Sequence, residues 1–293
     1  MDRVTLLGIP LYTMSKNHGM GESVRVFREL GITNTLQKNL GSLLDNGDAP
    51  LSGIHVDSGP KNLRNFQHFL RDTDSIRRAT ARIGTDGLGF FVGGECSIIV
   101  GVLAGLKNSV KGKPGVLWID AHGDFNTPET TPSGFIGGMA LALACGRGPK
   151  MNEPLEALRP LLAEENVVHI ASRALDPEED KAMSSSAMKL YPASRIHKDG
   201  VLKVADQAAS YLDDTCDWIT CHLDVDAIDP ESIPAINYPE RGGLSLEEVK
   251  VAVEAVRGTG KLKAFDLAGY NASLDHNNTS ARKLLKLVSE IFG

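Results

Sequence analysis

Short apolar segments alternate with longer segments of helical pattern along the whole chain. Six runs have the length and apolar character of buried parallel strands, and they lie at 4–9, 88–94, 115–120, 166–172, 218–226 and 261–269. Between them, apolar residues recur at helical spacing and predict helices at 22–30, 63–82, 97–106, 201–212, 245–257 and 279–291. Two polar stretches, 41–50 and 176–186, are expected to form loops, the second leading into a helix.

This alternation of strands and helices predicts an α/β protein with a mostly parallel sheet that is covered by helices on both faces. No shift in composition and no low-complexity linker marks a boundary, so residues 1–293 are expected to form one domain. The apolar stretch near the N-terminus is too short to span a membrane and is expected to be the first strand.

The charge and cysteine content of the chain argue against some classes of binding partner. The net charge is −6, and the chain has neither a basic tract nor a cationic helix face, which argues against nucleic acid and against an anionic membrane surface. The four cysteines lack the spacing of a disulfide framework and are expected to be reduced thiols. These features predict a cytoplasmic protein.

Acidic residues and a histidine follow two of the predicted strands. Asp120, His122 and Asp124 come directly after one apolar run, and Asp224 and Asp226 end another. Residues two apart in an extended segment share a face, and ligands of parallel sheets bind at the carboxyl ends of the strands. Carboxylates crowded in this way repel one another unless cations neutralise them.

Two interpretations of these acids remain open. They are either turn and cap residues, which aspartate often provides, or ligands of two hard divalent ions. Paired metals would supply a bridging hydroxide at neutral pH and polarise an electrophilic carbon. Phosphate-binding, dinucleotide-binding, zinc-protease and serine-hydrolase motifs are all absent from the sequence.

At this point the sequence resembles the ureohydrolase superfamily, the binuclear manganese hydrolases that include the arginases and agmatinases. The similar segments are KNHGMGESVRVFRELG, FVGGECS, WIDAHGDFNTPETTPSG, ASRALDPEE and HLDVDAIDP, followed by GGLS. The resemblance implies a three-layer α/β/α fold, a homo-oligomer (trimer or hexamer) and two Mn²⁺ ions at the strand ends. HGDFNTPETT and GGM also look like the Nω-hydroxy-L-arginine hydrolase subgroup, although that subgroup keeps a carboxylate where this chain has Gly269.

The resemblance implies a set of metal ligands. Asp120 and Asp224 would bridge both metals, His122 and Asp226 would complete one site, and Asp124 would belong to the other. The family has a histidine where this chain has Cys96. Because a thiolate suits Mn²⁺ less well than an imidazole does, that site is expected to bind its ion weakly or to hold Fe, Co or Zn. The alternative is that Cys96 is a buried small apolar residue.

The resemblance also implies where the substrate lies. Asn126 and Ser133 would bind the α-carboxylate of an amino acid, and Asp176 and Glu179 its α-amino group, unless all four serve only as turn and cap residues. Two positions depart from the family: Gly137 stands in place of a proton-transferring histidine and Gly269 in place of a guanidinium-binding glutamate. Tyr270 and Asp266 are the nearest polar candidates to replace that acid.

His222 shares a strand face with Asp224 and Asp226. It is either a partner that orients a carboxylate, a proton shuttle that replaces the one missing at Gly137, or a packed core histidine. With His122, Asp124 and Asp226 it completes the expected catalytic group. The expected activity is hydrolysis of a guanidino or N-hydroxyguanidino amino acid to urea or hydroxyurea and an ornithine-like amine. Another amidine or formimino substrate, and a non-catalytic subunit, are the alternatives.

Overall fold

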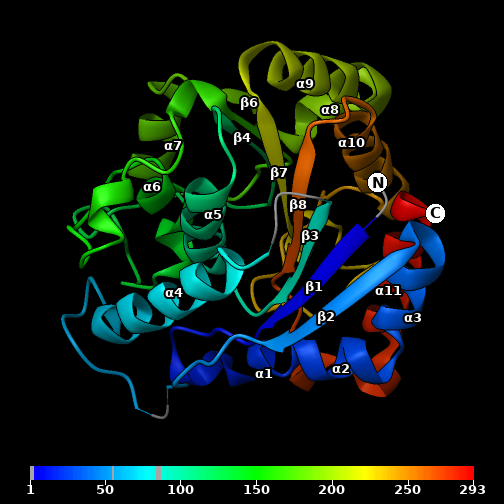
Figure 1. The fold of residues 1–293 in the computed structure, drawn as a ribbon. Coiled ribbons are helices and arrows are strands. Elements are labelled where there is room, and N and C mark those ends of the chain that lie inside the picture. The colour runs from blue at the N-terminus through cyan, green and yellow to red at the C-terminus, as the bar shows by residue number, and fades with distance from the viewer. Residues whose placement is uncertain (1–2, 55, 84–86) are drawn as a thin grey trace.

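The protein is built on one eight-stranded sheet. The computed structural model describes residues 3–293 except 55 and 84–86. In chain order the strands are β1 (Arg3–Ile9), β2 (Ser42–Asp48), β3 (Leu88–Gly93), β4 (Pro114–Ile119), β5 (Val167–Ile170), β6 (Lys189–Tyr191), β7 (Trp218–Asp224) and β8 (Leu262–Ala268). Their order across the sheet is β2-β1-β3-β8-β7-β4-β5-β6, and all of these pairings are parallel (Figure 1).

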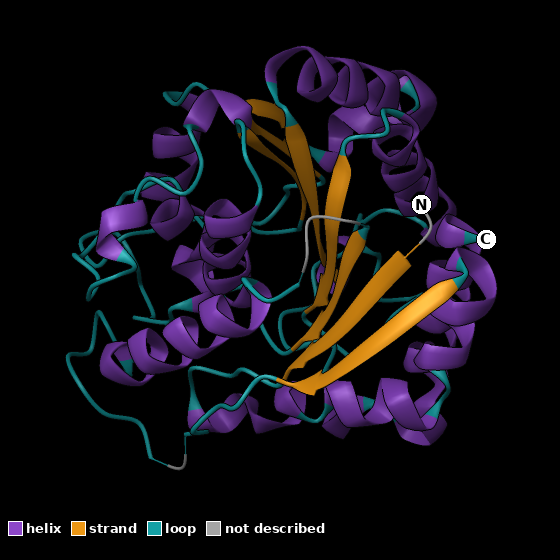
Figure 2. Cartoon of the chain, viewed as in Figure 1, coloured by secondary structure: helices purple, strands orange, loops and turns teal. Residues whose placement is uncertain are grey.

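Helices cover both faces of this sheet (Figure 2). Their bounds are α1 (His18–Gly21), α2 (Ser23–Glu29), α3 (Ile32–Leu40), α4 (Phe66–Thr80), α5 (Ile98–Ser109), α6 (Ala140–Ala144), α7 (Pro177–Ser184), α8 (Ala193–Asp199), α9 (Val201–Thr215), α10 (Leu246–Gly258) and α11 (Thr279–Phe292). One apolar core lies under α2, α3 and α8 to α11, and the other under α4 to α7. The predicted three-layer α/β/α architecture is confirmed.

All six predicted strands and all six predicted helices are present, with ends that differ by a few residues. Both loop predictions were wrong. Pro177–Ser184, within 176–186, forms α7, and Ser42–Asp48, within 41–50, forms the edge strand β2. Its side chains are mostly exposed, so it lacks the apolar run that marks a buried strand. The opposite edge strand, β6, has only three residues and was also missed.

The register of the central strands positions the functional site. Trp118 of β4 pairs with His222 of β7, which pairs in turn with Asp266 of β8. Beyond this row, toward the carboxyl ends, Asp224 of β7 pairs with Ala268 of β8, and Asp120 directly follows β4. In the part of the chain that the structure describes, no helix is long and apolar enough to cross a membrane.

Candidate metal centre

Four aspartates meet at the carboxyl ends of β4 and β7, as the sequence predicts. Asp120, Asp124, Asp224 and Asp226 are each at most 5% exposed. The strand register and the short turn after each strand bring them together, because β4 and β7 are neighbours in the sheet. Charged groups this deeply buried need a partner of opposite charge.

His122 is the cationic partner nearest to two of these acids. Its Nδ1 lies 3.0 Å from Asp226 Oδ2 and 3.6 Å from Asp120 Oδ1. Burial by itself lowers the pKa of His122, but the hydrogen bonds and charges of Asp120 and Asp226 outweigh it and raise the pKa to about 12. Without a metal the imidazole is therefore protonated, and a divalent ion would take over this neutralising role.

Asp124 has an unusual backbone and an unsatisfied carboxylate. Its φ is +48°, a left-handed conformation that aspartate tolerates better than most residues. Its backbone carbonyl accepts hydrogen bonds from the N–H groups of Leu141 and Ala142 at the start of α6. The buried Oδ2 has no partner among the described residues, and burial together with the Asp120 charge raises the pKa of Asp124. A buried, unpaired carboxylate oxygen of this kind fits a cation ligand.

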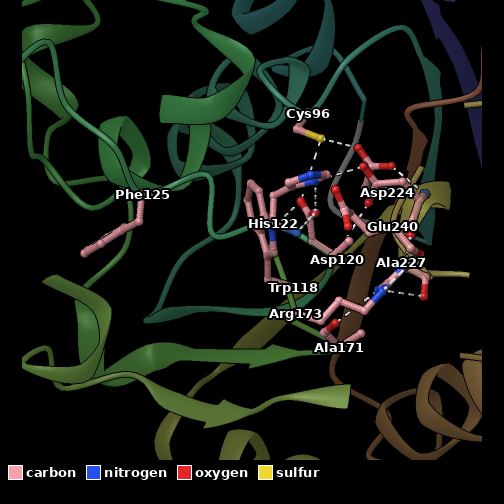
Figure 3. Close-up of polar contacts among 12 residues, drawn as sticks. Cys96, Trp118, Asp120, His122, Phe125, Ala171, Arg173, Asp224, Ala227 and Glu240 are labelled. Atoms are coloured by element: carbon pink, nitrogen blue, oxygen red, sulfur yellow. Dashed lines mark hydrogen bonds and ion pairs between the residues drawn. The ribbon is translucent and has the colours of Figure 1, made fainter. Parts of the chain in front are cut away.

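Cys96 lies at the same cluster, between β3 and α5. The thiol donates to Asp224 Oδ2 at 2.6 Å and lies 3.9 Å from Asp120 Oδ2, as Figure 3 shows. Burial and the neighbouring aspartates raise its pKa, so the thiol is protonated while no metal is bound. Its sulfur is thus within reach of two carboxylates, although its body also packs in the apolar core beneath α5.

His222 lies one row deeper in the sheet. Its Nδ1 is 2.5 Å from Asp266 Oδ1, and both side chains are completely buried. Its ring stands 4.0 Å from that of Trp118, whose Nε1 donates to Asp120 Oδ2 at 3.0 Å. His222 does not line the pocket, which argues against the predicted alternative of a proton shuttle to the substrate.

A cavity of about 250 Å³ opens above the aspartates. Four of the five residues assigned to substrate binding line it: Asn126, Ser133, Asp176 and Glu179. Other lining residues were not identified from the sequence, including Met14, Lys16, Met20, Phe135, Asn237 and Tyr238. They come from α1, from the 3-10 turn before it and from loops distant in sequence, and only the fold brings them to one place.

The structure places Tyr270 away from this cavity. Its ring packs edge-on against Phe27, with centroids 5.3 Å apart, and its hydroxyl donates to Asp275 at 2.9 Å. The carboxylate of Asp266 is hydrogen-bonded to His222, one residue row deeper in the sheet than the aspartates. Neither residue therefore brings a polar group into the pocket. The expectation that Tyr270 or Asp266 takes the place of the family's glutamate, where this chain has Gly269, was wrong.

The N-terminus of α7 contacts the loop that carries Asp124, one of the candidate metal ligands. Asp176 and Glu179 form a capping box at the start of this helix. Glu179 Oε1 also accepts from the Phe125 N–H at 2.8 Å, and Asp176 Oδ2 accepts from Asn126 Nδ2 at 2.9 Å. The sequence prediction offered capping and substrate binding as alternatives, but the geometry permits both because the two acids also line the cavity.

Two further residues position the loops around the site. Glu95 accepts from the backbone N–H of Thr13 at 2.9 Å and from the hydroxyls of Thr13 and Ser97, which holds the segment next to Cys96. Arg173 donates to the backbone carbonyls of Ala171 after β5 and of Ala227 after β7, and to that of Glu240 (Figure 3). It also donates to the carbonyl of Asp226 at 2.7 Å. Both residues lie in sequence segments that resemble the family. Their role in holding the loops in place depends on contacts between segments distant in sequence, which the sequence does not show.

Comparison with known proteins agrees with this geometry. Residues 2–293 match the model of the Arginase family. The chain is 31% identical over 295 residues to the arginase of Bacillus subtilis strain 168, covering 100% of this chain and 99% of that protein. The native structure of Bacillus caldovelox arginase superimposes with a TM-score of 0.93 at 28% identity, covering 100% of this chain and 99% of the other.

A second solved structure adds a ligand. Entamoeba histolytica arginase in complex with L-ornithine is similar with a TM-score of 0.90 at 28% identity, again covering 100% of this chain and 99% of that one. The full-length family match, the sequence relatives and the shared fold agree with the cluster of aspartates at the strand ends. This chain therefore belongs to the arginase family, the ureohydrolases that act on guanidino compounds and depend on a binuclear metal centre.

Proposed function

We propose that this protein hydrolyses the guanidino group of an α-amino acid, with two Mn²⁺ ions as the starting assignment for the metals. The observation that carries the proposal is one cavity lined by two chemically distinct groups of residues. One group is the buried Asp124, Asp224 and Asp226 with His122, to which we assign the guanidino end of the substrate. The other is Asn126, Ser133 and the acids of α7, to which we assign the carboxylate end. The relative solved with L-ornithine supports an amino-acid product of this length.

In this proposal, different residues bind the metals, bind the substrate and transfer the proton. Asp120, Asp124, Asp224, Asp226 and His122 would hold the metals, which when bound supply a nucleophile at neutral pH and polarise the guanidino carbon. Asn126 and Ser133 would bind the α-carboxylate, while Asp176 and Glu179 would attract the α-amino group. Asp226, 3.0 Å from His122 Nδ1, would hold a proton for the leaving amine.

The guanidino end favours a hydroxylated substrate. Gly269 lines the cavity and brings no carboxylate to neutralise a strongly basic guanidinium. An N-hydroxyguanidine is less basic, and its oxygen can itself approach a metal. We therefore propose Nω-hydroxy-L-arginine as the preferred substrate over L-arginine.

The test is ornithine release by the Mn²⁺-loaded protein with L-arginine, Nω-hydroxy-L-arginine and agmatine compared side by side. The hydroxylated amino acid should give the largest kcat/KM, and agmatine, which lacks the α-carboxylate, should be a poor substrate in a putrescine-release assay. Asp226→Asn should lower kcat by about 10²-fold or more, while Asp214→Asn on the exposed surface of α9 serves as the control. Equal rates with agmatine and the amino acids would contradict the assigned carboxylate end, and no turnover of any of the three would contradict the proposal.

A further inference from the structure

The buried His222 has an unexplained nitrogen. Its Nδ1 is paired with Asp266, but Nε2 has no hydrogen-bond partner among the described residues, and none of the side chain is exposed. An unpaired polar atom in a protein interior is destabilising and calls for an explanation. The unpaired nitrogen alone does not identify a ligand, because both ring nitrogens of the buried His169 also lack partners among the described residues, so the neighbours of His222 decide.

The position of this imidazole indicates what the partner is. One ligand atom each of His222, Cys96 and Asp120 lie within 4.8 Å of one another, and all three residues are buried. A single cation contacted by three ligands at ordinary bond lengths places those ligands at such separations. Nδ1 is already taken by Asp266, which leaves Nε2 as the free donor atom on the ring.

The surroundings of His222 favour metal binding over simple packing. The carboxylate of Asp266 fixes the ring orientation and makes the imidazole a better donor, as second-layer carboxylates do in many metal sites. Trp118 stacks on the ring and also binds Asp120 Oδ2, so it holds two of the three groups in place. These contacts preorganise a pocket for an ion between the side chains.

We infer that His222 is a metal ligand, which together with Cys96 and Asp120 replaces the imidazole that the arginase family has at position 96. The inference rests on the metal dependence in the proposed function. A sulfur, nitrogen and oxygen donor set favours Co²⁺, Fe²⁺ or Zn²⁺ over Mn²⁺, so the two metal sites of this protein differ in preference.

The experiment measures Co²⁺ binding to the metal-free protein by equilibrium dialysis and by absorption. The unaltered protein should bind two ions per chain and show a thiolate-to-cobalt charge-transfer band, which Cys96→Ser removes. His222→Asn retains a donor for Asp266 but lacks an atom at the position of Nε2, and it should weaken one of the two sites by about 10–100-fold or more. Asp266→Asn, which leaves the imidazole in place, should weaken the same site by about 10–100-fold.

His169→Asn is the matched control. This histidine is also completely buried, pairs with the other side of Trp118 in the sheet and has unpaired ring nitrogens, but among the described residues it belongs to no group of potential metal ligands. The variant should leave both sites unchanged. Cys96→His in the His222→Asn background should restore the second ion. Two-site binding that is unchanged in His222→Asn and in Asp266→Asn would overturn the inference while leaving the proposed function intact. If the unaltered protein bound no divalent ion, that result would overturn the metal dependence of the proposed function, and this inference with it.

Discussion

At the residue scale, the side chains that depart from the family are the most informative. The sequence identified the acids from their place after apolar runs, because the ends of parallel strands meet at one edge. It did not reveal that His222 faces Asp266, since strand register is needed to align residues 44 positions apart. Nor did it show that Tyr270 is buried against Phe27, a contact between residues far apart in sequence.

The backbone conformation of Gly269 and its close approach to Asp224 leave no room for a side chain at this position. Its φ is +84°, and an added Cβ would lie 2.1 Å from Asp224 Oδ1. Gly269→Ala should therefore lower the free energy of unfolding by about 1–3 kcal/mol and weaken metal binding, because Asp224 must move. Denaturant unfolding and Co²⁺ dialysis measure the two effects.

Gly200→Ala provides the control for backbone strain. Gly200 has nearly the same φ, +87°, but an added Cβ would meet nothing within 4 Å. Its ψ of 135° lies outside the left-handed helical region, so Gly200→Ala should cost about 1–3 kcal/mol of backbone strain and leave metal binding unchanged. If both variants bound Co²⁺ with unaltered affinity, the close approach of Gly269 to Asp224 would not matter for the site.

At the scale of elements, central strands were predictable and edge strands were not. The six central and near-central strands are apolar on both faces because helices cover them. At the edges, β2 is largely exposed and β6 is very short, so burial leaves little trace in their sequences. The functional site lies at the ends of the central strands. Its acidic residues could therefore be identified from the sequence although the two edge strands were not predicted.

The capping box of α7 allows stability to be separated from substrate binding. Asp176→Ala removes the helix cap and the contact to Asn126, and it should cost about 1 kcal/mol of stability. If Asp176 also attracts the α-amino group, KM for the amino-acid substrate should rise while kcat changes little. Steady-state kinetics and thermal unfolding of the same preparations give both quantities.

A second capping box supplies the control for this variant. Ser245 caps α10 in the same way, with Glu248 as its partner, and neither residue lines the cavity. Ser245→Ala should lose a similar amount of stability with no change in KM. An unchanged KM in Asp176→Ala would restrict Asp176 to its capping role.

At the scale of the whole molecule, a metal site made of buried acids makes stability depend on pH and on metal together. Burial, followed by the charge of Asp226, raises the pKa of Asp224 to about 7 in the metal-free fold, compared with 3.8 in an unfolded chain. Between these values the folded state binds more protons than the unfolded state does. The unfolding free energy of the metal-free protein should therefore fall as pH rises through this window, and the loss should be complete above pH 7.

Metal reverses this dependence, because a divalent ion binds the ionised carboxylates and displaces protons. The melting temperature of the metal-loaded protein should exceed that of chelator-treated protein by little at pH 5.5 and by progressively more up to pH 8. Thermal unfolding at fixed ionic strength, with and without Mn²⁺, measures the difference. A gap that stayed constant with pH would mean that the aspartates are ionised without metal, and that His122 alone neutralises them. A gap that widens would show that the cluster exchanges protons for metal, which is the behaviour that a site of mutually repelling acids requires.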